Sequence, residues 1–146
     1  MDKNRKFSLE DAKKASEEQS LYEWILNYLR SEGQNSKLSQ YLMEAKPKHV
    51  FLKEFPLMKL LRIMGPESNM IFKESEDKWE ARVNSLIKSL KSGEEFPPLI
   101  VTDLWKDLQL SDGSHRHEAL IRFGIEKYWT VFLFTKDESL QLTKDY

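Results

Sequence analysis

The order of strand-like and helix-like segments most constrains the fold of this chain. From residue 48 onward the pattern reads strand, helix, strand, strand, helix, strand. Strands are expected at 49–52, 99–101, 108–110 and 128–134, and helices at 77–91 and 114–123. Segments in this mixed order are typical of an α+β domain, in which helices pack on one sheet. The sequence therefore predicts an α+β fold for residues 48–135.

A pair of amphipathic helices is expected before this domain, within residues 1–47. Ser8 followed by Asp11 matches a capping box, and neither Pro nor Gly interrupts the chain from there to Gly33. One apolar stripe runs along this first helix at helical spacing: Leu21, Trp24, Ile25, Tyr28 and Leu29. A second, shorter helix is expected over 37–45. Residues 136–146 are expected to form a polar, peripheral tail.

Composition excludes several classes of protein. The 146 residues suit one domain with a short additional module, and the absence of cysteine excludes disulfides, thiolate catalysis and cysteine-based metal sites. The net charge of -1 gives no basic excess for binding DNA. The chain begins with charged residues, and no apolar run approaches the roughly 20 residues that span a membrane. We expect a soluble, cytoplasmic protein.

The segment 110–120 has the richest chemistry, because it joins a strand to a helix. The first N–H groups of a helix are unpaired and carry partial positive charge, which favours anion binding. Gly113 would let a phosphate approach the backbone closely. Arg116 and His115 would add donors, and Asp112 would hold magnesium or cap the helix. This pattern indicates a phosphate site.

The same segment also has a plain structural interpretation. A strand, an Asp-Gly turn and a helix capped by Ser114 occur in many proteins that bind nothing there. His115 and His117 are two residues apart and point to different sides of a helix, so a metal site made from that pair is not expected.

The motif Asp112-Gly113-Ser114-His115-Arg116 resembles that of the ParB/sulfiredoxin superfamily. Sulfiredoxins have Gly-Cys-His-Arg at this place, partition ParB proteins have Gly-Glu-Arg-Arg, and free-serine kinases of this fold have Asp-Gly-His-His-Arg, the most similar pattern. The upstream segment Phe96–Val101 is similar to the Pro-Pro strand of the family. The resemblance covers about residues 48–135 and implies a mixed sheet with packed helices. It also implies nucleotide phosphates bound by Gly113, Ser114, His115 and Arg116.

The chain departs from the family in three ways. Ser114 stands where sulfiredoxin has its catalytic cysteine, so sulfinic-acid reduction is not expected. His115 stands where ParB has the first arginine of its motif. A partition ParB would continue into a helix-turn-helix and a dimerisation domain, so a complete ParB of that kind is not expected.

The free-serine kinases use an earlier glutamate as general base, and the resemblance implies one here. Glu54, Glu67 and Glu74 lie in the expected region, and Glu67 is the first choice, although each would otherwise be a solvated surface residue. The family often has a basic residue after the first strand that contacts the nucleotide, which here would be Arg62. His117 is assigned with Arg62 to the surroundings of the site.

Two functions are predicted. The first is a ParB-like nucleotide-binding protein that holds ATP, ADP or CTP with Mg²⁺ at Asp112, with phosphoryl transfer or nucleotide hydrolysis as its chemistry and Asp112 and Glu67 as catalytic residues. The second is a non-catalytic, regulatory or DNA-associated module that acts through protein partners on the N-terminal helices. A third alternative is that the site is degenerate and the protein binds only other proteins.

Overall fold

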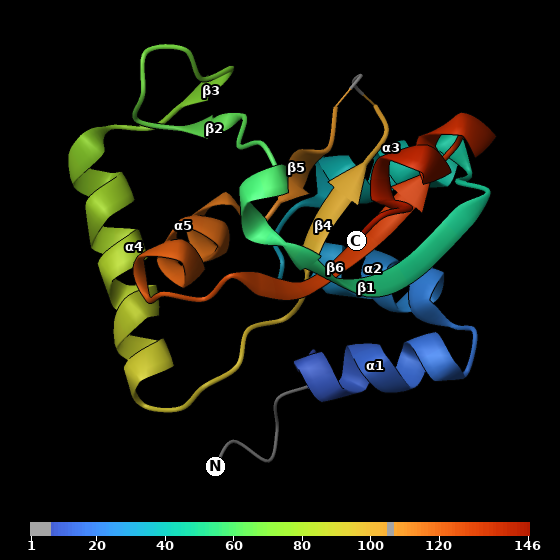
Figure 1. Cartoon of the computed structure of the whole chain (residues 1–146), viewed down its shortest axis with the longest axis horizontal. Helices are drawn as coiled ribbons and strands as arrows, with labels where there is room; N and C mark the ends of the chain where they lie inside the picture. The colour runs from blue at the N-terminus through green and yellow to red at the C-terminus, as the bar shows by residue number, and fades with distance from the viewer. Residues whose placement is uncertain (1–6, 105–106) are drawn as a thin grey trace.

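The computed structural model describes residues 7–104 and 107–146 and contains a four-stranded sheet between two layers of helices (Figure 1). The strand order is β1 (His49–Pro56), β6 (Lys127–Phe134), β4 (Leu99–Thr102) and β5 (Gln109–Asp112). β4 runs parallel to β6, and the other two pairs are antiparallel. The predicted α+β class with a mixed sheet is confirmed.

One face of the sheet is covered by α4 (Glu76–Lys91), α5 (Ser114–Arg122) and the 3₁₀ helix η2 (Asp137–Thr143). The apolar face of α4 places Trp79 and Val83 in the core, next to Leu120 of α5. On this face β1 and β6 supply a cluster of aromatic rings: Phe51, Phe55, Phe132 and Phe134.

The opposite face is covered by three helices, α1 (Leu9–Glu17), α2 (Leu21–Arg30) and α3 (Ser36–Ala45). The helices and the strands bury one shared cluster, with Ile25, Leu29 and Leu42 from the helices and Ile100, Val131 and Leu133 from the sheet. β1 begins at His49, one residue after the predicted boundary, and the helices before it contribute to the core of the sheet. The division into domains stays a prediction.

The prediction of one uninterrupted helix up to Gly33 is wrong. The chain breaks between α1 and α2, where Gln19 has a left-handed φ of 59°. Ser8 does cap the first helix, accepting a hydrogen bond from Asp11 N at 3.1 Å. The chain changes direction at this break without Gly or Pro. As a result, Ala15 of α1 and Leu21 of α2 both lie in the same core cluster.

Other element boundaries differ from the prediction because strand pairing extends the strands. β1 extends to Pro56 because all eight of its residues pair with β6. β5 continues to Asp112, so the predicted loop at Ser111 and Asp112 is the end of a strand. The ambiguous segment after β1 forms the short 3₁₀ helix η1 (Leu57–Lys59) and then a bridge from Leu61 to Gln109.

Two further segments complete the structure. A small parallel ladder joins β2 (Met64–Gly65) to β3 (Phe72–Lys73). The tail predicted as peripheral folds back as η2, and Asp103 holds it by accepting hydrogen bonds from the backbone of Thr135 and the hydroxyl of Ser139. The predicted turn at 103–106 falls partly on residues 105 and 106, outside the described residues. No helix within the described ranges is long and apolar enough to cross a membrane.

Candidate phosphate-binding groove

The start of α5 is shaped by Gly113, which lies between the end of β5 and the first helical residue. Its φ is 105°, a conformation that residues with a side chain rarely adopt. A Cβ there would lie only 2.9 Å from Leu99 Cδ2 and 2.9 Å from Arg116 Nη2. Among the described residues, no side chain caps the helix at Gly113. Its first N–H groups have no acceptor within the helix, which is the arrangement expected of an anion site.

A groove opens beside this helix start. It consists of two adjoining cavities, of about 160 Å³ and about 220 Å³, that share several lining residues. The smaller cavity reaches Asp112, Gly113 and His115, and the larger one reaches Phe96 and Pro97. The shared wall comes from α2, the turn after it, α4 and α5: Tyr28, Glu32, Arg82, Leu86 and Arg116. We call these two cavities together the groove.

Arg116 lines the groove, but its donors are used within the protein. Nη2 donates to the carbonyl oxygen of Pro98 at 2.9 Å, and Nη1 donates to the Tyr28 hydroxyl at 3.0 Å. Its side chain is 14% exposed, and Nη2 also lies 3.6 Å from Asp112 Oδ2. Nε is buried and has no partner among the described residues. Arg116 therefore connects α5 to α2 and to the residue before β4. It has fewer free hydrogen-bond donors for a ligand than the sequence predicts.

Asp112 is engaged in the same way. Its Oδ1 accepts a hydrogen bond from Asn35 Nδ2 at 2.9 Å, and its Oδ2 faces Arg116. Each of its carboxylate oxygens therefore already faces a nitrogen of the protein. In the described parts of the chain, no group of three or more His, Cys, Asp or Glu could hold a metal ion. The predicted magnesium site at Asp112 does not fit this geometry.

Arg82 is the cation that the sequence did not identify. It lies on α4, is exposed, and lines both cavities of the groove. It has no ion-pair partner among residues 7–104 and 107–146. A single arginine on a charged helix has no distinguishing pattern in the sequence. The one available signal was its position at the border of the apolar stripe, four residues before Leu86.

His115 and Ser114 occupy the first turn of α5 as predicted. The His115 ring lies 4.7 Å from the Trp79 ring, and its Nε2 lies 2.8 Å from Glu74 Oε1. Glu74 is thus the candidate glutamate that contacts a residue of the motif. Ser114 is buried and lines neither cavity of the groove.

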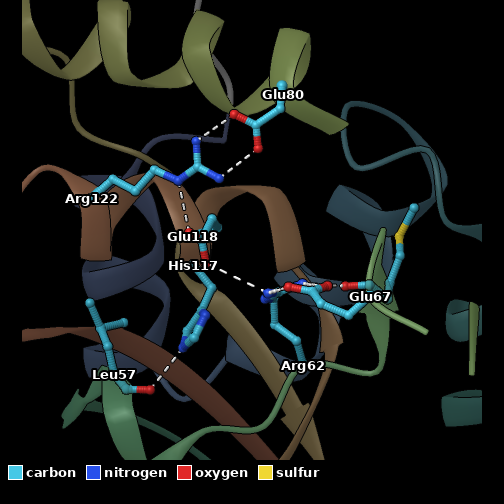
Figure 2. Close-up of polar contacts among 8 residues, drawn as sticks. Leu57, Arg62, Glu67, Glu80, His117, Glu118 and Arg122 are labelled. Carbon is cyan, nitrogen blue, oxygen red and sulfur yellow. Dashed lines mark hydrogen bonds and ion pairs between the residues drawn. The ribbon is translucent and has the colours of Figure 1, made fainter. Parts of the chain in front are cut away.

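The predicted catalytic Glu67 lies in a different cluster, which contains Arg62 and Glu118 of α5 (Figure 2). Arg62 donates to both of its carboxylate oxygens, at 2.6 and 3.1 Å, and also lies 3.7 Å from Glu118. The hydrogen bonds from Arg62 lower the pKa of Glu67 below its ordinary value. A carboxylate paired in this way is a weak base. Neither Arg62 nor Glu67 lines the groove.

The same cluster continues through Arg122 and His117 (Figure 2). Arg122 donates to Glu80 at 2.7 and 2.8 Å and to Glu118 at 2.8 Å, joining α5 to α4. His117 is buried, and its Nε2 donates to the carbonyl oxygen of Leu57 at 2.8 Å. Burial lowers the pKa of His117. His117 is a buried residue that does not line the groove, so the prediction that it belongs to the surroundings of the phosphate site is not supported by its position.

The chain is similar in structure to sulfiredoxin and to ParB proteins. Sulfiredoxin from Arabidopsis thaliana has a TM-score of 0.42 and 22% identity, over 62% of this chain and 93% of its own. The C-terminally truncated chromosome-partitioning protein ParB from Caulobacter crescentus, complexed with CTP-gamma-S, has a TM-score of 0.40 and 21% identity, over 61% of this chain and 47% of its own. A Pnob8-like ParB-N domain has a TM-score of 0.39 and 18% identity, over 64% of this chain and 32% of its own.

At such identities these similarities concern the fold alone. The chain spans less than half of either ParB chain that it matches. No protein-family model and no curated protein matches the sequence. The finer resemblance to free-serine kinases stays a prediction.

Proposed function

We propose that this protein binds a nucleoside di- or triphosphate, with the phosphates at the N-terminus of α5. One observation supports the proposal above all. The uncapped helix start at Gly113 opens into a polar cavity that also holds Arg82, a cation without an ion-pair partner among the described residues. A phosphate there would accept hydrogen bonds from the first N–H groups of the helix and charge-assisted ones from Arg82. ATP, ADP and CTP remain the candidate ligands.

Three residues of the predicted motif, Gly113, His115 and Arg116, have a definite role in this proposal. Gly113 keeps the approach to the backbone open, and the N–H groups that follow it bind phosphate oxygens. His115, oriented by Glu74, adds a ring nitrogen at the cavity wall. Arg116 fixes the wall itself through Tyr28 and Pro98. Arg82 replaces Arg116 as the main charged contact.

Between the two predicted functions, the geometry favours binding without turnover. Glu67 is paired with Arg62, and Asp112 is held by Asn35 and Arg116, so neither predicted catalytic carboxylate is available as a base. Nucleotide would then act as a regulatory ligand, with protein partners on the N-terminal helices as the prediction had it. Incubation of the protein with saturating ATP or CTP tests this choice: release of inorganic phosphate at a steady rate would restore the enzymatic alternative.

The binding itself is tested by thermal unfolding and calorimetry with ATP, ADP, CTP, GTP and inorganic triphosphate. A ligand at 100 times its dissociation constant raises the free energy of unfolding by about 2.7 kcal/mol. Arg82→Gln should weaken the binding by about tenfold, the effect of one charge-assisted hydrogen bond. Because Arg82 is exposed, the variant should stay folded.

Lys88→Gln is the matched control. It removes the same charge from an exposed position of the same helix, but Lys88 does not line the groove. Equal weakening by both variants would indicate a long-range charge effect and not a site. If no ligand raises the unfolding midpoint at millimolar concentration, the proposed function is wrong.

A further inference from the structure

A second surface of the protein collects exposed apolar side chains apart from the groove. Met58 is 78% exposed, Leu61 48%, Tyr146 46% and Leu142 36%, and all four line one cavity of about 270 Å³. Met58 also lines a second cavity, of about 410 Å³. Of the described residues, none lines both the groove and either of these cavities. We call the two cavities and their lining residues the Met58 surface.

Met58 projects from a turn that the core holds in place. It is the middle residue of the 3₁₀ helix η1, and Leu57 before it is fully buried. The backbone N–H of Leu57 donates to the Glu126 carbonyl oxygen at 2.9 Å, and the Leu57 carbonyl oxygen accepts from His117 at 2.8 Å. Leu60, which follows the helix, is buried as well. The fold therefore holds Met58 in solvent on a fixed support, although a methionine side chain is more stable when it is buried.

An apolar hollow lies directly beside this projecting side chain. The 410 Å³ cavity is lined by apolar residues from the end of β1, the end of α5 and the loop before β6: Pro56, Ile121 and Ile125. A cavity of about 150 Å³ is enough for a benzene molecule, so this one is large enough for a methionine side chain. In a two-fold contact each copy presents the same surface, so a projecting group must lie beside a hollow that accepts it. The Met58 surface meets that requirement.

The charged residues of the Met58 surface are equal in number of each sign. Lys59 and Asp107 line the smaller cavity, and Glu126 and Lys127 line the larger one. None of the four has an ion-pair partner in the part of the chain that the structure describes. A uniformly acidic or basic partner would meet as many like charges as opposite ones. A second copy, in contrast, supplies an opposite charge for each of them.

We propose that two copies of this chain associate through the Met58 surface about a two-fold axis. Met58 of each copy enters the 410 Å³ cavity of the other, and Lys59, the next residue, pairs with Glu126 of the second copy. The surface has fewer residues than the roughly 20–30 per partner of a standard interface, so the dimer is weak and concentration-dependent. The proposal is independent of the proposed function, because the Met58 surface and the groove share no lining residue.

Sedimentation velocity of the full chain over a range of concentrations, without nucleotide, tests the proposal. The sedimentation coefficient of the unmodified protein should rise with concentration from the value of a monomer to that of a dimer. Met58→Glu should raise the dissociation constant of the dimer by about tenfold or more, because it places a charge in an apolar cavity. Because Met58 is mostly exposed, the variant should keep the unfolding midpoint of the unmodified protein.

Met43→Glu is the matched control, since Met43 is 48% exposed on α3 and lines neither cavity. It should leave the dissociation constant unchanged. Charge reversal tests the predicted ion pair. Lys59→Glu and Glu126→Lys should each weaken the dimer severalfold, and the double variant should restore it, because it reverses both partners.

A protein that stays monomeric at every concentration would overturn the proposal. A dimer that persists in Met58→Glu, or that Met43→Glu weakens equally, would also overturn it, since either result would place the contact elsewhere. Failure of the double charge reversal to restore the dimer would overturn the proposed arrangement of the two copies.

Discussion

The charged residues at the two ends of α5 differ in whether they have ion-pair partners. At the end shown in Figure 2, each arginine has a carboxylate partner: Arg62 pairs with Glu67, and Arg122 pairs with Glu80 and Glu118. At the other end, the helix start is uncapped and Arg82 faces the groove without an ion-pair partner in the described ranges. Paired charges hold elements together, whereas unpaired ones are available to a ligand. We therefore assign the first end to stability and the second to binding.

Substitution of Arg116 should have the largest effect on stability. This residue is an exception to the comparison, because it lines the groove but is paired like a structural residue. We expect Arg116→Ala to lower the free energy of unfolding by about 3 kcal/mol, since it leaves the mostly buried Asp112 without its cation. Urea denaturation measures the change. Arg82→Ala is the control and should change stability by less than about 0.5 kcal/mol. Equal stability of the two variants would contradict the structural role of Arg116.

Gly113 should have the next largest effect, and Gly124 is its natural control. Both have positive φ, 105° and 94°, so alanine costs about 1–2 kcal/mol of backbone strain at either position. Only at Gly113 would the added Cβ also press on Leu99 and Arg116, whereas nothing lies within 4 Å at Gly124. We expect Gly113→Ala to be the less stable variant in urea and the only one to lose triphosphate binding. Retained binding would show that the backbone approach is not needed.

Arg122 tests the paired end with a smaller expected effect. Its side chain is 33% exposed, and exposed ion pairs contribute about 1 kcal/mol or less. Arg122→Gln should therefore lower stability slightly and leave the affinity for triphosphate unchanged in calorimetry. A loss of affinity comparable to that of Arg82→Gln would mean that the two ends of α5 are not independent.

The smallest expected effect is a pH dependence from His117. Because burial lowers the pKa of His117 below its ordinary value of 6.5, the unfolded chain binds this proton at higher pH than the folded chain. The free energy of unfolding should therefore decrease as the pH falls below about 6.5. Chemical denaturation at pH 7.5 and 5.5 should show a larger decrease for the unmodified protein than for His117→Gln. Identical decreases in the two proteins would mean that folding does not lower the pKa of His117.

The sequence predicts most of the fold because its elements have strong local signals. The stripe on α2, the capped start of α1, the Pro-Pro entry to β4 and the aromatic strand β6 all lie within a few residues of the prediction. The break at Gln19 was missed because a left-handed glutamine has no local signature. The full length of β1 was missed because its last four residues are ordered by pairing with β6.

The candidate site is harder to predict from the sequence, because the role of each charged residue depends on its tertiary hydrogen-bond and ion-pair partners. Asp112 and Arg116 look available in the motif, but Asn35, Tyr28 and Pro98 use them, and these partners are 18 to 88 residues away. Arg82 looks ordinary in the sequence and becomes notable only because the fold places it in the lining of both cavities of the groove. The motif located the site, and tertiary contacts reassigned the residues within it.

Asn35 is a single side chain that joins two parts of the molecule. Its Oδ1 accepts from Leu38 N and caps α3, while its Nδ2 donates to Asp112 beside the groove. Tyr28, Glu32 and Gly33 of the groove also come from the N-terminal helices. If these helices were exchanged in evolution while the sheet was kept, the choice of ligand would change with them. The ligand preference would then depend on the helical segment and not on the sheet.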